Sequence, residues 1–278
     1  MVAASEEEEE EEMMAAEEEE EEMIMVEVDE ELLPGIFAMP HATLDAAHLV
    51  VAQDWSVLIG VPAQSDELLA LVRAETSPDM MVVTARCEDA AAQLFWLEAF
   101  PEMQRVVHRM DAGRGALRRE SDWLLSAGND ALGRAELKFT PADADDDEDE
   151  RQRTADDGPW LLKPLLRARW TPGPTNGHVV LHYEKFGGIL FSGRLCGVLG
   201  DDFNPFAFED DHAVEDHVCS LELLADDKDF NFEWVLPARG RAIKFKDPEE
   251  AREGLRFAVK RAELLLGDAQ EITKAMRE

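Results

Sequence analysis

The side chains best able to bind a metal ion or to move a proton in this sequence are its seven histidines. His178 and His182 lie on one predicted strand with three residues between them, so they share a face of it. Their Cβ atoms would be about 13 Å apart at roughly 3.3 Å per residue, too far to hold one metal ion. His212 and His217 do not align on a predicted helix, and His108 ends a strand alone. Each is therefore expected to be a surface or hydrogen-bonded histidine.

Motifs for nucleophilic catalysis are also missing from the sequence. No Ser-His-Asp order or nucleophile elbow is present, and Gly187-Gly188 is typical of a hairpin turn rather than of a phosphate-binding loop. Cys87, beside Arg86, could act as a thiol nucleophile, although a small buried cysteine is the favoured interpretation. The cysteine count is three, with no C-x-x-C spacing, which indicates a reducing compartment without a disulfide framework.

Charge divides the 278 residues into two unlike parts. The chain carries 62 Asp and Glu against 27 Lys and Arg, for a net charge of −35. Residues 1–31 hold 17 acids and no base, so the rest of the chain carries −18, and residues 143–150 hold seven more acids. Anionic segments repel a phosphate backbone, so nucleic-acid binding is not expected. The acidic N-terminal tail instead predicts a basic protein partner, with which opposite charge would speed association.

The domain organisation follows from the same charge distribution. Blocks of like charge cannot bury enough apolar area to fold, so residues 1–32 are predicted to be a disordered acidic tail. One folded domain is predicted over 33–278, with an acidic disordered insertion at about 142–157. No apolar run approaches the roughly 20 residues of a transmembrane helix, and no signal or transit peptide is recognised. The expected location is the cytoplasm, or the chloroplast if a transit peptide is missing from the chain.

The apolar pattern of the remaining chain alternates between strands and helices, which is typical of a layered α/β fold. Short β-type runs at 47–52 and 55–61 predict a hairpin. Ser65 is a candidate N-cap for a helix that ends at Glu75, and a helix over 88–100 is stopped by a proline. The other predicted elements are strands at 80–84, 104–108, 178–184, 189–192 and 233–236, regular structure at 161–170, a variable hairpin region at 113–157, a polar loop at 197–211, and helices at 212–226 and 248–266.

Four landmarks in this order resemble those of the metallo-β-lactamase-fold hydrolases, the glyoxalase II-like superfamily. In that family a strand ends in a T-P-G-H-T-x-G turn, a hairpin ends in F-[ST]-G-D, a later strand ends in a P-G-H-G loop, and an earlier strand runs into a T-H-x-H-x-D-H loop. The matching segments here are WTPGPTNG at 170–177, HVVLHYEKFGGILFSGR at 178–194, FNFEWVLPARGRAIKF at 230–245 and MMVVTARCEDAAAQLFWLEAF at 80–100. The resemblance spans roughly residues 36–266 and implies a four-layer αββα sandwich. A branch common in photosynthetic organisms is the most similar.

The family's metal ligands do not carry over with these landmarks. There, His and Asp side chains hold one or two Zn²⁺ or Fe ions, which lower the pKa of bound water. In this sequence Pro174 stands at the turn histidine, Arg194 at the bridging aspartate and Arg239 at the final histidine, with Ala238 at the usual glycine. Ala85 stands at the first histidine of the earlier loop.

The remainder of that earlier loop retains two residues that could ligate a metal. Cys87 stands at the second histidine, Asp89 matches the aspartate and Ala90 replaces the last histidine. If the loop is of a longer variant, Asp89 also falls out of register. An arginine carries a permanent positive charge and no lone pair, and near a dication it would cost several kcal/mol. No metal cofactor is therefore expected.

The resemblance leaves three functional hypotheses. The first is a catalytically inactive metallo-β-lactamase-like protein that acts as a binding, structural or regulatory subunit. The second is a metal-dependent hydrolase of the thioesterase or glyoxalase II type with atypical ligands. The third is a small-anion binder, because Arg194 and Arg239 would converge on the former metal pocket. Against the third, each arginine could pair with a local acid, for example Asp201, Asp202 or Glu233. Neither a particular partner nor an oligomeric state is indicated.

Overall fold

The structure is a computed structural model. It describes residues 26–29, 31–86, 89–112, 123–125, 159–199, 202–206 and 214–277. The segment 1–25, most of the predicted acidic tail, lies outside the described residues, as does the predicted insertion at 142–157. Within the segment assigned to the tail, strand β1 (Val26–Glu27) pairs antiparallel with β2 (Ile36–Pro40), and the predicted domain begins beside the fully buried Leu33.

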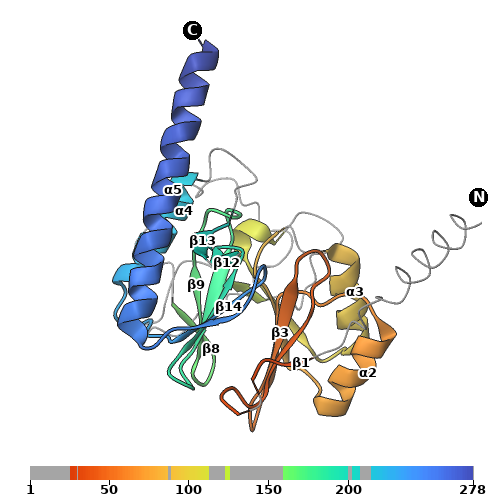
Figure 1. The fold of residues 1–278 in the computed structure, drawn as a ribbon. Helices are drawn as coiled ribbons and strands as arrows, with labels where there is room; N and C mark the ends of the chain where they lie inside the picture. The colour runs from red at the N-terminus through yellow and green to blue at the C-terminus, as the bar shows by residue number, and fades with distance from the viewer. Residues whose placement is uncertain are drawn as a thin grey trace, which may run out of the picture.

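The N-terminal half builds a seven-stranded sheet in chain order, with two helices on its outer face (Figure 1). Neighbouring strands are antiparallel from β1 to β4 and parallel from β4 to β7. The helices are the crossovers that parallel strands require. After β2 the elements are β3 (Ala46–Val51), β4 (Ser56–Ile59), α2 (Asp66–Glu75), β5 (Met80–Val83), α3 (Ala90–Ala99), β6 (Gln104–His108), a 3₁₀ turn η1 (Arg109–Asp111) and β7 (Trp123–Leu125).

The C-terminal half builds a six-stranded sheet in the order β15-β14-β11-β10-β9-β8, with a separate hairpin formed by β12 and β13. Strands β11 and β14 are parallel, and the other pairs in this sheet are antiparallel. The elements are β8 (Trp160–Lys163), β9 (Leu166–Trp170), β10 (Val179–Tyr183), β11 (Ile189–Gly193), β12 (Cys196–Leu199), β13 (Asp202–Pro205), α4 (Val214–Asp226), β14 (Trp234–Pro237), β15 (Ile243–Lys244) and α5 (Pro248–Arg277).

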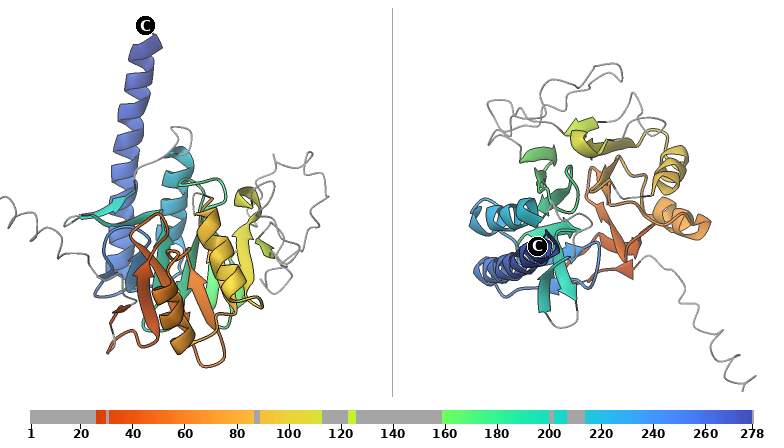
Figure 2. Two further views of the ribbon diagram at one scale, coloured as in Figure 1. Left: turned by 90° about the vertical axis from the view of Figure 1, so that its right-hand side faces the viewer. Right: turned by 90° about the horizontal axis from the view of Figure 1, so that it is seen from above.

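Three hydrophobic clusters join four layers (Figure 2). Because side chains alternate along a strand, β10 turns Val179, Leu181 and Tyr183 into the cluster between the two sheets and Val180 toward α4 and α5. The third cluster joins the first sheet to α2 and α3. The predicted αββα sandwich is therefore confirmed.

Local sequence signals account for most of the element boundaries. The Ser65 side chain accepts a hydrogen bond from Leu68 N–H at 3.1 Å and caps α2, as predicted. The predicted hairpin at 47–61 is β3 and β4, whose register pairs Leu49 with Leu58. No described helix is long and apolar enough to cross a membrane.

Two parts of the C-terminal half differ from the predicted elements. The predicted polar loop at 197–211 contains most of the β12–β13 hairpin, whose strands are too short and mixed in polarity to show a periodic pattern. Helix α5 continues to Arg277 instead of ending near residue 266, and its C-terminal part extends beyond the sandwich (Figure 1). The first half of α5 packs by Leu255, Ala258 and Ala262 against the second sheet.

Candidate functional site

Four loops meet at the edge of the sandwich where β5, β11 and β14 end. These four loops form what we call the loop edge. They are residues 84–86, 171–177, 193–195 and 237–241. Val179 N–H, at the start of β10, donates to Thr84 O at 3.0 Å, which holds the first loop beside the strand that follows the second, and Ala238 N–H donates to Gly193 O at 2.9 Å, which joins the last two. All four predicted landmarks therefore lie at one edge of the fold.

His178 connects two of these loops from a fully buried position. Its Nε2 accepts a hydrogen bond from Arg194 N–H at 3.1 Å, and its Nδ1 lies 2.9 Å from Thr171 Oγ1 and 3.1 Å from Thr171 O. Because Nε2 accepts, Nδ1 carries the proton. A Cβ on Gly193 would lie 2.7 Å from this Nε2, and Gly193 has a φ of 55°, so the close approach needs glycine.

Asp111 connects the loop at 84–86 to the turn at 171–177 through its carboxylate. It accepts hydrogen bonds from Arg86 N–H at 2.9 Å, from Gly177 N–H at 3.0 Å and from the Thr175 hydroxyl. Burial raises the pKa of this carboxyl, and the three hydrogen bonds oppose that shift. Asp111 is only 6% exposed, so its donors have little access to water as an alternative partner. The carboxylate thus fixes the turn at 171–177 to the loop after β5.

The two arginines of the predicted anion site lie on neighbouring segments but in different environments. Arg239 is exposed, whereas Arg194 is half-buried. The Gly193–Ala238 hydrogen bond brings their backbones close together. Glu233, one of the acids considered as a partner, instead lies beside Gly187 at the far end of β14. Asp201 and the side chain of Asp202 lie outside the described residues.

The loop after β5 carries the two remaining candidates for metal ligands, Cys87 and Asp89. Asp89 is the N-cap of α3, and its Oδ1 accepts from Ala92 N–H at 2.8 Å. Cys87 lies outside the described residues. Ala85 is fully buried and offers no donor atom. Thus the one described candidate of this loop serves the helix that follows it.

The residues that the sequence landmarks predict at ligand positions do not have the chemistry of Zn²⁺ or Fe ligands. Pro174 and Ala85 have no side-chain lone pair, and Arg194 and Arg239 carry positive charge, which repels a dication. Within the described ranges, no group of three or more His, Cys, Asp or Glu side chains is placed to hold a metal ion.

The histidines that the sequence predicts to be surface or hydrogen-bonded residues are mostly buried. His217 donates from Nε2 to Leu195 O at 2.7 Å, and its backbone abuts Gly173 of the turn. His182 donates from Nε2 to Asn231 O at 2.8 Å, and its ring stacks on that of Phe230. His108 stacks on Trp170. The hydrogen-bonded alternative is confirmed for His178, His182 and His217, and the surface alternative is wrong for them because each is at most 2% exposed.

Burial also sets the charge state of these rings. It lowers the pKa of His178 to about 3 and that of His217 to about 4, with the proximity of His217 adding to the shift at His178. Both imidazoles are therefore neutral near pH 7. Sequence reasoning missed that His178 bridges Thr171 and Arg194, and it missed Asp111 altogether. The available signal for Asp111 was a carboxylate three residues after the end of a buried strand.

Solved structures with the same architecture are metallo-β-lactamases. A structure of DIM-1 metallo-β-lactamase exposed to ceftazidime matches with a TM-score of 0.55 at 13% identity, over 84% of this chain and 97% of that chain. TMB-1 matches with a TM-score of 0.54 at 14% identity, over 86% and 98%. MEM-A1, a subclass B3 metallo-β-lactamase from a soil metagenome library, gives 0.51 at 16%, over 89% and 96%. No family model and no curated protein matches the sequence.

The fold class is thereby defined as a four-layer αββα sandwich. More particularly, the chain has the metallo-β-lactamase fold. Identities of 13 to 16% carry the fold and not the activity of these enzymes.

Proposed function

We propose that this protein is a catalytically inactive member of the metallo-β-lactamase fold that serves as a binding, structural or regulatory subunit. The observation that carries the proposal is the side-chain chemistry at the loop edge. Arg194 and Arg239 bring positive charge to ligand positions of the fold, and Pro174 brings no donor atom. Catalytic zinc sites typically use three protein ligands.

Protein hydrogen bonds support the same proposal. In this chain the Asp111 carboxylate and the His178 ring hydrogen-bond loops of that edge to one another. A buried hydrogen-bonded network can fix loop geometry without metal. On this proposal, the fold serves to present a surface to a partner and not to hold a catalytic metal.

Metal content tests the proposal directly. The untagged full-length protein, refolded with excess Zn²⁺, Fe²⁺ or Mn²⁺ and then dialysed, is expected to hold less than about 0.1 ion per chain by mass spectrometry. As a matched variant, Ala85→His/Pro174→His/Arg194→Asp/Arg239→His restores the family's donors at four positions and is expected to retain more zinc. One or two ions per wild-type chain would instead support the alternative, a thioesterase or glyoxalase II-type hydrolase with atypical ligands.

Small-anion binding by Arg194 and Arg239 is a second candidate, supported by the Gly193–Ala238 hydrogen bond between their neighbours. Two guanidinium groups would favour a carboxylate or phosphate. We expect citrate or phosphate to raise the melting temperature of the wild-type protein, and the variant Arg194→Glu/Arg239→Glu to lose that rise. Lys244→Glu/Lys246→Glu is a control with the same charge change at exposed positions. Equal thermal shifts in both variants would contradict a specific site.

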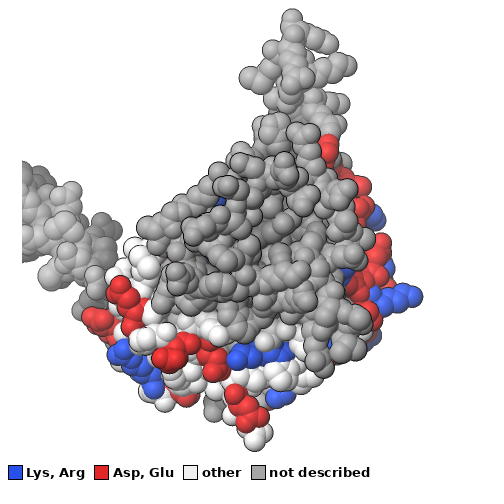
Figure 3. All heavy atoms as spheres, turned by 180° about the vertical axis from the view of Figure 1, so that it is seen from behind, with Lys and Arg blue, Asp and Glu red and all other residues white. Residues whose placement is uncertain are grey.

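The negative charge of the N-terminal tail favours a partner protein with a basic surface. Residues 1–31 carry 17 acids without a base, and long-range attraction between such a segment and a basic partner raises the association rate. On the face shown in Figure 3, Asp and Glu side chains gather along the side that bears α4 and α5, with Lys and Arg side chains among them. Mixed charge of this kind offers little attraction to a nucleic-acid backbone.

A further inference from the structure

A histidine occupies a position between the two sheets where the strand pattern calls for an apolar side chain. In β3, Ala47 and Leu49 face the helices α2 and α3, and Val50 faces the second sheet. By alternation His48 shares the face of Val50, and its ring meets that of Phe191 edge-on at 5.4 Å between centroids. His48 is therefore part of the interface between the sheets.

The ring of His48 makes no hydrogen bond within the described part of the chain, although the residue as a whole is buried, with 5% of it exposed. Both ring nitrogens of His178 have partners, whereas His182 and His217 each leave Nδ1 buried without one among the described residues. The nitrogens of His48 are not among the fully buried atoms that lack a partner, so they keep an accessible side on which a bound molecule could meet them.

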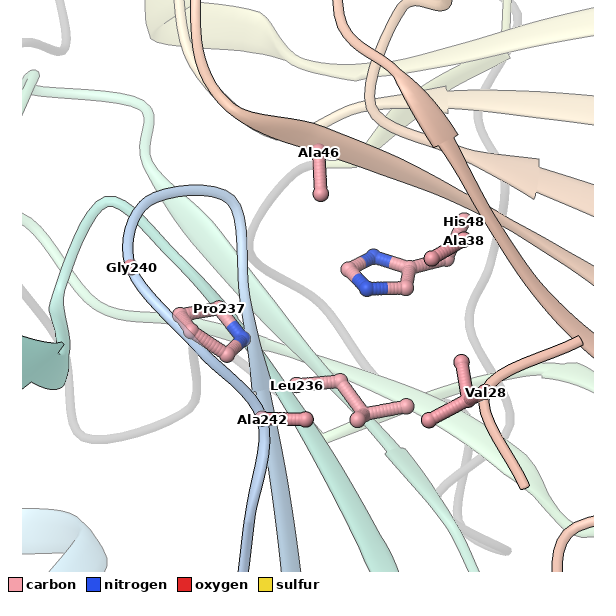
Figure 4. Close-up of a pocket in the computed structure, with 8 residues that line it drawn as sticks. All are labelled: Val28, Ala38, Ala46, His48, Leu236, Pro237, Gly240 and Ala242. Carbon is pink, nitrogen blue, oxygen red and sulfur yellow. The ribbon is translucent and has the colours of Figure 1, made fainter. Parts of the chain in front are cut away.

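A cavity lies directly at this ring. It has a volume of about 260 Å³ and is bordered on one side by β2 and β3 and on the other by the end of β14 and the loop that follows it (Figure 4). Figure 4 shows the His48 ring projecting between the two sides, toward Pro237 and Leu236. The space exists because small residues line it. The lining residues are Val28, Ala38, Ala46, His48, Leu236, Pro237, Gly240 and Ala242.

We propose that this cavity is a binding site for a small, uncharged, mainly apolar molecule that carries one hydroxyl or carbonyl group, and that His48 hydrogen-bonds that group. The apolar walls bind the body of the ligand, and the imidazole is the polar group that fixes its orientation, as in small-molecule sites generally. The cavity shares the loop 237–241 with Arg239, but neither Arg194 nor Arg239 lines it, and the inference does not rest on the proposed function.

The chemistry of the lining selects this class of ligand. None of the lining residues other than His48 is ionisable, and burial together with the nearby His41 lowers the pKa of His48 to about 3, so the site is uncharged at neutral pH. A neutral imidazole has one donor and one acceptor nitrogen, which suits a carbonyl or a hydroxyl. An ion would lose its hydration without a counter-charge. Since benzene fits an apolar cavity of about 150 Å³, one ring with a polar substituent fits here.

Phenol and toluene are matched probes for this site, because they have nearly the same size and differ in the hydroxyl group. Both are titrated into the full-length protein while the methyl NMR signals of Ala38, Ala46 and Ala242 are followed. Phenol is expected to shift all three signals in a saturable manner. If neither probe shifts these methyl signals at millimolar concentration, the proposal is overturned.

Two variants separate the role of the ring from that of the space. His48→Phe keeps the packing on Phe191 and removes the hydrogen bond, so phenol should bind about three- to tenfold more weakly while toluene binds at least as well. Ala242→Leu, at the exposed loop, should fill the cavity and weaken both probes. Unchanged phenol affinity in His48→Phe would contradict the role of His48, and unchanged affinities in Ala242→Leu would contradict this cavity as the site.

Discussion

Lowering the pH from 6.5 to 5.0 is expected to reduce the free energy of unfolding by about 2 kcal/mol for each of three buried histidines. The folded-state pKa is lowered to about 3 for His48 and His178 and to about 4 for His217, mainly by burial. The unfolded chain therefore takes up protons below pH 6.5 that the folded chain does not. Stability from these groups is present above pH 6.5 and is lost as the pH falls toward the folded-state values.

The unfolded chain has four further histidines and 62 Asp and Glu side chains, some of which also take up protons in this interval, so the share of one buried ring is read by comparing variants. Urea unfolding followed by circular dichroism at pH 8.0, 6.5, 5.75 and 5.0 measures the effect. The curve should be nearly flat from pH 8.0 to about 7 and fall steeply below 6.5.

One variant measures how much the ring of His217 contributes to this loss of stability at low pH. His217→Gln keeps an N–H donor for Leu195 O but cannot titrate, so the loss of stability between pH 6.5 and 5.0 should be smaller by about 2 kcal/mol. The comparison uses each protein's own value at pH 8.0 as its reference, which removes any constant cost of the substitution. If the variant loses as much stability as the wild type, protonation of His217 does not contribute to acid unfolding.

The order of elements could be predicted because it depends on local patterns. Ser65 caps α2, the apolar runs of β3 and β4 pair as a hairpin, and Pro101 follows the C-cap residue of α3. By contrast, β12 and β13 are four residues each and lie mostly in a segment that reads as polar. Their pairing depends on contacts with α5, through Phe203 among others, which no local pattern encodes.

The candidate site was predictable in outline and not in its interactions. The four landmarks indicated that loops from distant segments meet at one edge, and the Thr84–Val179 and Gly193–Ala238 hydrogen bonds place them there. The sequence could not show that Arg239 is exposed while Arg194 is half-buried. Nor could it show that Asp89 caps a helix, because an aspartate after a strand suits a ligand and an N-cap equally.

Removing the Asp111 carboxylate is expected to destabilise the protein by about 3–5 kcal/mol, one of the largest effects of a single substitution in this fold. In Asp111→Ala, the N–H groups of Arg86 and Gly177 and the hydroxyl of Thr175 all lose their acceptor at once. Each buried donor left without a partner costs about 1–3 kcal/mol before the loops relax. Urea unfolding of the full-length protein at pH 8.0 measures the loss.

Two further variants distinguish this network from the general cost of removing an aspartate. Asp111→Asn keeps one acceptor oxygen for the N–H groups and should cost about 1–2 kcal/mol. Asp79→Ala removes a more exposed carboxylate that accepts one backbone N–H, from Ser56, and should cost about 1 kcal/mol. Amide hydrogen exchange at Gly177 should accelerate in Asp111→Ala and not in Asp79→Ala. Equal losses of stability in the two alanine variants would mean that Asp111 is not what holds the loop edge together. In that case its loops would depend on the His178 hydrogen bonds and on the packing of the two sheets.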